Sequence, residues 1–189
     1  VSGDLKSIRN YLTILKKKDT SAENHEIFDE IRMGVEMALE NTRKVSYNLM
    51  PPLLETFGLV TALKDYLDGL SRKTEIAFRV ESETEEVTLS AAVAYELFRI
   101  VQELTTNMIK YGAVSEATVI LGFTDTNFKI MIVDNGIPFN FAGLLVTSKG
   151  TGVKNINSRL KIIGAEFVQD TVEKGNSFTI LLKKEKCLE

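Results

Sequence analysis

The sequence predicts an α+β protein in which an antiparallel helical hairpin is followed by an α/β sandwich. Residues 5–49 carry apolar side chains at steps of three and four, with a break at residues 19–21, as two helices joined by a turn would. From residue 75 onward, short β-branched runs alternate with helical patterns, which is typical of a sheet covered by helices. Two consecutive prolines separate the two patterns. We therefore expect a hairpin over residues 1–52 and a second domain over residues 53–189.

The composition argues against several classes of function. Lys+Arg 23 against Asp+Glu 26 gives a net charge of -3, so there is no general electrostatic case for a nucleic acid partner. The single cysteine, Cys187, predicts neither a disulfide framework nor a zinc site, and a reducing compartment fits. No apolar run approaches the roughly 20 residues that span a bilayer. Because the chain opens at Val1 without an initiator methionine, we expect a fragment of a longer protein.

The predicted hairpin has heptad spacing in both helices. Leu5 to Leu15 forms the first run and Phe28 to Leu49 the second. Two antiparallel helices cannot enclose their own apolar seam, so the simplest solution is pairing with a second copy into a four-helix bundle. We predict a homodimer through the hairpin. The alternative is that the hairpin packs on the downstream domain of its own chain.

After the hairpin, Pro51 and Pro52 are expected to end the second helix, and a linker continues to Gly58. The predicted elements that follow are a helix over 59–70, a strand over 75–81, a central helix over 90–112, a strand hairpin over 117–123 and 128–133, a mobile lid over 137–149, a helix over 151–163, and closing strands over 166–172 and 177–182. Together they predict a mixed, mainly antiparallel sheet with helices on one face.

The central helix carries a polar stripe besides its apolar one. Arg99, Glu103, Asn107 and Lys110 recur at steps of three and four, so the last three side chains can converge on one small volume. An acid, an amide oxygen and a cation can together hold a hydrated metal and a phosphate chain. Taken alone, the stripe is more typical of a solvated helix face, and Arg99 is interpreted as a structural charge.

Two glycine motifs extend this pattern. The Asp134–Gly136 segment (Asp-Asn-Gly) places a carboxylate at the end of a strand, where it could accept the exocyclic amine of adenine, although a tight turn with a solvated Asp is the alternative. Gly150–Gly152 (Gly-Thr-Gly) precedes a predicted helix, whose free N–H groups favour phosphate. Neither a Walker loop nor a complete dinucleotide fingerprint is present.

In their combined order these motifs resemble those of the GHKL ATPases. More narrowly, the chain is similar to sensor histidine kinases of the subfamily with a short dimerisation and phosphoacceptor hairpin. RIVQELTTNMIKYG (99–112) matches the N box, VDNGIPF (133–139) and GTGVKNINSRLKIIGAEF (150–167) match the two glycine boxes, and NLMPPLLETFGL (48–59) matches the interdomain segment. The resemblance covers nearly the whole chain and implies the GHKL (Bergerat) ATP-binding fold for residues 53–189.

The resemblance implies a site for ATP and Mg²⁺. Glu103 would be the catalytic acid that polarises the attacking nucleophile, Asn107 would coordinate Mg²⁺, and Asp134 would hold the adenine amine. The other nucleotide-binding residues that it implies are Lys110, Tyr111, Gly136, Pro138, Gly150, Thr151, Gly152, Val153 and Ser177. Among these, Lys110 would steady the phosphates and the glycines of the second box would lead into a helix cap on them.

The implied function is that of a cytoplasmic histidine kinase core, from a bacterial parent that is either soluble or anchored in the membrane. It would transfer the γ-phosphoryl group of ATP to a histidine on the hairpin, for relay to an aspartate of a response regulator. In the family the acceptor histidine lies just upstream of the position of Val1, so we expect the fragment itself not to autophosphorylate. His25, the only histidine, falls beside the hairpin turn, outside the acceptor motif.

Three positions depart from the family pattern. Gly3 stands where the subfamily has a glutamine for phosphatase activity, Pro138 replaces the second glycine of the first glycine box, and Tyr111 stands where histidine is common. Gly3 and Pro138 favour an alternative, a non-catalytic dimerising module that retains ATP binding. A GHKL serine kinase acting on a regulatory protein is the third hypothesis, but such kinases lack the heptad hairpin.

Overall fold

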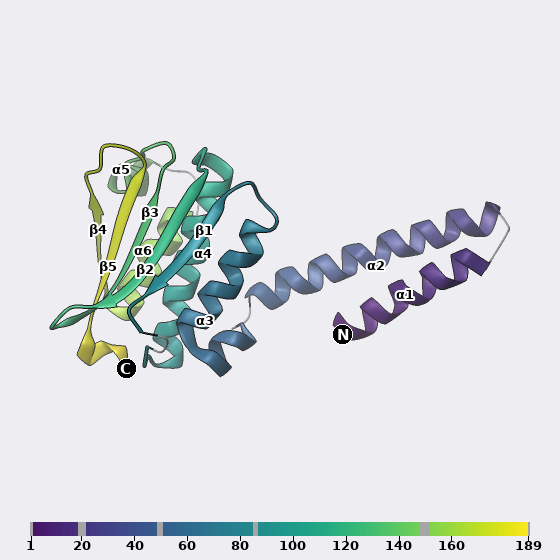
Figure 1. The fold of residues 1–189 in the computed structure, drawn as a ribbon, viewed down its shortest axis with the longest axis horizontal. Coiled ribbons are helices and arrows are strands. Elements are labelled where there is room, and N and C mark those ends of the chain that lie inside the picture. Colours follow the sequence, from purple (N-terminus) through teal and green to yellow (C-terminus); the bar gives the residue numbers. More distant parts are fainter. Residues whose placement is uncertain (1, 19–21, 49–50, 85–86, 148–151, 189) are drawn as a thin grey trace. The chain divides into compact units, whose positions relative to one another are not determined.

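The computed structural model describes residues 2–18, 22–48, 51–84, 87–147 and 152–188. Contacts divide the chain into two compact units, Val1–Pro51 and Pro52–Glu189 (Figure 1). Within the described ranges, no helix is both long and apolar enough to cross a membrane.

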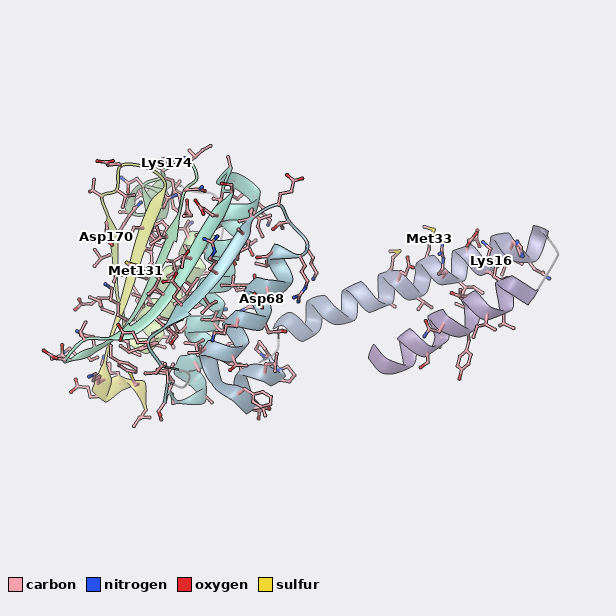
Figure 2. The ribbon with its side chains drawn as sticks, in the orientation of Figure 1. Lys16, Met33, Asp68, Met131, Asp170 and Lys174 are labelled. Carbon is pink, nitrogen blue, oxygen red and sulfur yellow. The ribbon has the colours of Figure 1, made fainter. Side chains whose placement is uncertain are left out.

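The first unit consists of helices α1 (Ser2–Lys18) and α2 (Ala22–Asn48), which lie side by side (Figure 1). Lys16, labelled in Figure 2, donates from Nζ to Asp29 Oδ2 and so links α1 to α2. This hydrogen bond is the main cause that holds the pKa of Asp29 below its ordinary value. The contact is largely open to solvent, so it orients the two helices more than it stabilises them.

The two helices leave much of their apolar surface uncovered within a single chain. The exposed large apolar side chains of this unit are Ile8, Tyr11, Ile14, Leu15, Ile27, Ile31, Met33 and Met37. Isolated exposed apolar residues are ordinary, but this concentration on two neighbouring helices forms the kind of surface that protein interfaces cover.

The second unit is built on a five-stranded sheet in the order β1-β2-β3-β5-β4. The strands are β1 (Ala77–Ser82), β2 (Glu116–Phe123), β3 (Asn127–Asp134), β4 (Glu166–Asp170) and β5 (Asn176–Lys183). The β1/β2 pair is parallel and the other three pairs are antiparallel, which confirms the predicted mixed sheet. The β3/β5 register pairs Asp134 with Asn176 at one end of the sheet.

The helices α3 (Pro52–Ser71), α4 (Ala91–Tyr111) and α6 (Gly152–Ile163) cover one face of this sheet (Figure 1). Burial alternates along β3, so every second side chain enters the core beneath the helices. The α4 helix begins after Ser90, whose hydroxyl accepts a hydrogen bond from the N–H of Val93, and it packs against both α3 and α6. Its apolar stripe is buried in the core, whereas the side chains of its polar stripe lie outside the core.

One predicted boundary is wrong at the start of the second unit. The linker expected up to Gly58 is instead helical, because α3 already begins at Pro52. Proline lacks an N–H but fits the first position of a helix, where that group has no partner. Leu54 is only 4% exposed, so burial of this first segment explains why it folds onto the second unit.

The other differences concern short elements without a clear period. The predicted lid contains a short helix, α5 (Phe141–Thr147), and β4 ends at Asp170 instead of residue 172. A single 3-10 turn, η1 (Lys184–Cys187), follows β5 and buries Cys187, whose carbonyl accepts a hydrogen bond from Ser90 N at 2.7 Å. Burial raises the pKa of the Cys187 thiol, against an opposing effect of Lys184. This terminal turn thereby contacts the start of α4.

Gly58 permits a kink inside α3, with φ 75° and ψ -178°. Only glycine adopts this conformation without strain, although a Cβ at this position would meet nothing within 4 Å. We predict that Gly58→Ala lowers the free energy of unfolding by about 1–3 kcal/mol, the usual cost of such strain. Urea denaturation followed by circular dichroism measures the change.

Gly69 provides a matched control in the same helix. A Cβ there would meet only Arg72 Nη2, at 4.0 Å, and Gly69 has no positive φ. Gly69→Ala should therefore be neutral or stabilising by up to about 1 kcal/mol, because alanine has the higher helix propensity. Equal effects of the two substitutions would show that the kink is not a conformational requirement.

Candidate nucleotide pocket

The second unit contains a cavity of about 620 Å³, a size typical of small-molecule sites. It lies where α4, the lid, α6 and the ends of β3 and β5 meet. Its lining residues are Glu103, Asn107, Met108, Lys110, Tyr111, Gly112, Asp134, Ile137, Phe139, Leu144, Gly152, Val153 and Asn176. The cavity therefore combines the polar stripe of α4 with apolar side chains of the lid.

The polar stripe of α4 faces the first residue of α6. Glu103 and Asn107 are half-buried, one helical turn apart. A Cβ added to Gly152 would lie 2.5 Å from Glu103 Oε1 and 3.6 Å from Asn107 Nδ2. Glycine at residue 152 thus allows the N-terminus of α6 to approach the acid and the amide closely. The structure brings together two motifs that the sequence separates by the whole lid.

An ion pair links α6 to α4 outside the lining of the pocket. Arg159 Nη1 lies 2.5 Å from Glu96 Oε2, and the two side chains are 24% and 14% exposed. The Arg159 guanidinium also stands 5.9 Å from the centre of the Tyr95 ring. Because a half-buried pair holds its geometry better than an exposed one, it restricts how α6 can shift relative to Glu103.

Asp134 is a buried carboxylate, 4% exposed, at the end of β3. Its Oδ1 accepts a hydrogen bond from Gly136 N at 2.8 Å, and Asn176 Nδ2 lies 3.1 Å and 3.2 Å from its two oxygens. Within the described part of the chain, no lysine or arginine forms an ion pair with it. Neutral donors hold the carboxylate, and its remaining acceptor capacity is available to a ligand amine.

The turn after Asp134 is in close contact with the end of α4. A Cβ at Gly136 would lie 2.3 Å from the carbonyl oxygen of Gly112, and Ile137 N donates to the same oxygen at 2.7 Å. No side chain larger than hydrogen fits between these two backbones. Gly136 therefore supports the pocket from behind and does not line the cavity.

Seven of the predicted site residues line the cavity, namely Glu103, Asn107, Lys110, Tyr111, Asp134, Gly152 and Val153. Besides Gly136, two others do not reach it. Pro138 is exposed and lines a separate, shallow depression together with Asp170 on β4. Ser177 donates from Oγ to Asp170 Oδ2 at 3.2 Å, because neighbouring residues of a strand face opposite sides of the sheet. Gly150 and Thr151 fall outside the described residues.

Several lining residues were not predicted from the sequence. Asn176 is the most important, since it contacts Asp134 directly and is 3% exposed. The register that pairs it with Asp134 would have identified it, but this register is not readable from the chain. The lid residues Ile137, Phe139 and Leu144 and the α4 residues Met108 and Gly112 complete the missed set.

The residues present fit a nucleotide accompanied by Mg²⁺. The described residues contain no cluster of three or more His, Cys, Asp or Glu that could hold a metal ion alone. Asn107 supplies an amide oxygen at the cavity, which suits Mg²⁺ because it binds through few protein ligands and takes the rest from phosphates and water. The apolar side chains around Asp134 are suited to a flat base, with the carboxylate to orient it.

Comparison with known proteins places the chain in a family. No family model matches it. The sensor histidine kinase LiaS of Bacillus subtilis is 32% identical over 137 residues, which are 71% of this chain and 37% of that protein. The chain spans between 27% and 37% of the length of the curated relatives it matches.

Two solved structures have the same fold. The histidine kinase domain of the blue-light activated kinase from Erythrobacter litoralis gives a TM-score of 0.57 at 14% identity, covering 97% of this chain and 95% of that one. The ATP binding domain of PrrB from Mycobacterium tuberculosis gives 0.52 at 17% identity, covering 66% and 90%. The chain therefore belongs to the sensor histidine kinase family, and its second unit has the fold of the histidine kinase catalytic (GHKL ATP-binding) domains.

Proposed function

We propose that the second unit binds ATP with Mg²⁺ and that, in the parent protein, it transfers the γ-phosphoryl group to a histidine. One observation carries the proposal: the buried Asp134 carboxylate, which forms no ion pair with the described residues, shares a cavity with the Glu103/Asn107 stripe. The helix from Glu103 to Gly112 rises roughly 13 Å at 1.5 Å per residue, the scale of an extended nucleoside triphosphate. The family and the fold support the same function.

The Asp134 side of the cavity suits adenine. The carboxylate can only accept hydrogen bonds, and a base with an exocyclic amine supplies the matching donor. Met108, Ile137 and Leu144 provide apolar contacts for the faces of the base. A guanine would present a carbonyl oxygen at the corresponding position, and two acceptors would then oppose each other. The site is therefore expected to prefer adenine nucleotides.

The Glu103 side suits the phosphates. Free N–H groups and positive potential at the start of α6 favour phosphate oxygens, and Lys110 adds a cation at the cavity. Asn107 would hold Mg²⁺, whose charge would neutralise that of the phosphates. Glu103, one turn away on the same helix, is positioned to polarise an incoming nucleophile. Phosphoryl transfer depends mainly on such positioning and on charge neutralisation.

The proposal is tested first by binding. In isothermal titration with Mg²⁺ and a non-hydrolysable ATP analogue, we expect the wild-type chain to bind. Asp134→Asn should weaken binding at least tenfold, because a hydrogen bond to a charged group contributes about 1.5–3 kcal/mol. In the wild type, the analogue should bind more tightly with Mg²⁺ than with EDTA. Asn107→Ala should remove most of this difference in dissociation constant.

Asp68 supplies the matched control for this experiment. It is an exposed acid on α3, far in sequence from the pocket motifs (Figure 2), and Asp68→Asn removes the same charge without touching the lining. The Asp68→Asn chain should bind the analogue with the same affinity as the wild type. A wild-type chain that does not bind the analogue, or an Asp134→Asn chain that binds it normally, would refute the proposal.

Phosphoryl transfer requires the upstream residues that contain the acceptor in the family. With these residues restored, incubation with radiolabelled ATP should produce acid-labile, base-stable phosphate on histidine. Glu103→Gln should reduce this labelling by about 100-fold or more, as expected for loss of a general base, while the analogue still binds. Binding without any labelling of the restored wild-type protein would instead identify a non-catalytic ATP-binding module. A labelled product would next be offered to response regulator receiver domains.

We also propose that the chain is a homodimer through its first unit. The uncovered apolar side chains on α1 and α2 are the supporting observation. Light scattering at micromolar protein should give twice the chain mass. Ile14→Glu with Ile31→Glu should produce a monomer, because charges at an apolar interface lose solvation. Ile162→Glu changes an exposed isoleucine on α6, outside the first unit, and should leave the dimer intact. A monomeric wild-type mass would contradict the proposal.

A further inference from the structure

The base of the lid, residues 137–141, is held by two side-chain amides, one from the edge strand β4 and one from its neighbour β5. Gln169 on β4 donates from Nε2 to the carbonyl of Phe139, and its Oε1 accepts a hydrogen bond from Phe141 N at 2.9 Å. Asn176 on β5 donates to the carbonyl of Ile137 at 3.1 Å and accepts from Phe139 N at 3.0 Å. We call the Gln169 and Asn176 amides together the amide clamp.

The amide clamp binds alternate residues of the lid base, as a neighbouring strand would, but with side chains in place of a backbone. Aromatic contacts reinforce it: the Phe139 ring lies 5.3 Å from that of Phe178, and the Phe141 ring lies 4.5 Å from that of Phe167. The base of the lid is thereby tied to β4 and β5. The sequence predicted one mobile lid over residues 137–149.

The clamped segment forms a wall of the proposed nucleotide pocket. Ile137 and Phe139 line the cavity, whereas Gln169 does not and lies instead beside the shallow depression behind the lid. Asn176 also contacts Asp134, so its effect on a ligand would be direct. Gln169 can act on a bound base only through the backbone that it holds. This difference makes Gln169 the residue whose role can be isolated.

We propose that Gln169 is a positioning residue for the nucleotide base, because its amide fixes the Ile137–Phe139 wall before the ligand binds. The inference rests on the proposed function. Without the two hydrogen bonds, the lid base detaches part of the time, and only the attached form offers the wall. The apparent dissociation constant rises by the inverse of the attached fraction.

The test compares Gln169→Leu with Gln169→Glu in the complete 189-residue chain. Leucine has a similar volume and removes both hydrogen bonds, whereas glutamate retains an acceptor for Phe141 N and loses the donor to Phe139 O. Gln102→Leu is the control, since Gln102 on α4 accepts a hydrogen bond from Arg99 and does not line the cavity. The readouts are the dissociation constant for Mg-ADP by isothermal titration and amide hydrogen exchange of residues 137–144 without ligand.

We expect Gln169→Leu to weaken Mg-ADP binding roughly tenfold, in line with the loss of two ordinary hydrogen bonds. Exchange of the lid-base amides should accelerate by a similar factor, and Gln169→Glu should fall between Gln169→Leu and wild type in both readouts. Gln102→Leu should match the wild type. Should Gln169→Leu fail to fold, Gln169→Glu alone must still show the smaller change in both.

Two outcomes would overturn the inference. Faster exchange with Mg-ADP affinity within twofold of wild type would mean that the clamp holds the lid but does not position the base. Unchanged exchange would mean that the amide does not hold the lid at all. If the wild-type chain fails to bind Mg-ADP, the proposed function fails, which is a separate result because the exchange measurement still reports on the clamp.

Discussion

The second unit depends on burying the Asp134 carboxylate, which neutral donors hold and which forms no ion pair within the described ranges. A buried charge is costly unless hydrogen bonds satisfy it, and here the donors are the Gly136 backbone and the Asn176 amide. These partners require a turn directly after β3 and the β3/β5 register that pairs Asp134 with Asn176. The pairing of β3 with β5 at the centre of the sheet therefore also forms the floor of the pocket. A slip of this register by one residue would remove the donor and turn the side chains of β5 to the opposite face.

The features that local patterns determine were predictable from the sequence. The buried and polar stripes of α4 follow from its period, and Glu103, Asn107 and Asp134 lie in motifs whose residues are close along the chain. Asn176 could not be found this way, since its role depends on a partner 42 positions away. The prediction of Ser177 shows the same limit. On a strand, the residue next to the correct one faces the other side of the sheet.

Competing local rules explain the remaining differences. Proline ends helices and also begins them, and the burial of Leu54, which depends on the folded unit, decides in favour of a helix starting at Pro52. The lid shows no helical period in its sequence because α5 is too short. The base of the lid is held by side chains from strands that follow it in the sequence. Gln169 illustrates this point. In the sequence it is an ordinary polar residue of a predicted strand.

The two sides of the pocket are held by different interactions: hydrogen bonds to the sheet on the Asp134 side, and helix packing on the Glu103 side. The Asp134 side is fixed to the sheet by backbone and amide hydrogen bonds, so it is formed before a ligand arrives. The Glu103 side depends on the packing of α6 on α4, which the Glu96–Arg159 pair restrains. Phosphoryl transfer is sensitive to small displacements of the reacting groups. Under the proposed function, contacts between α4 and α6 should therefore influence the rate of phosphoryl transfer more than nucleotide affinity. Contacts that hold the lid base should influence affinity more than the rate.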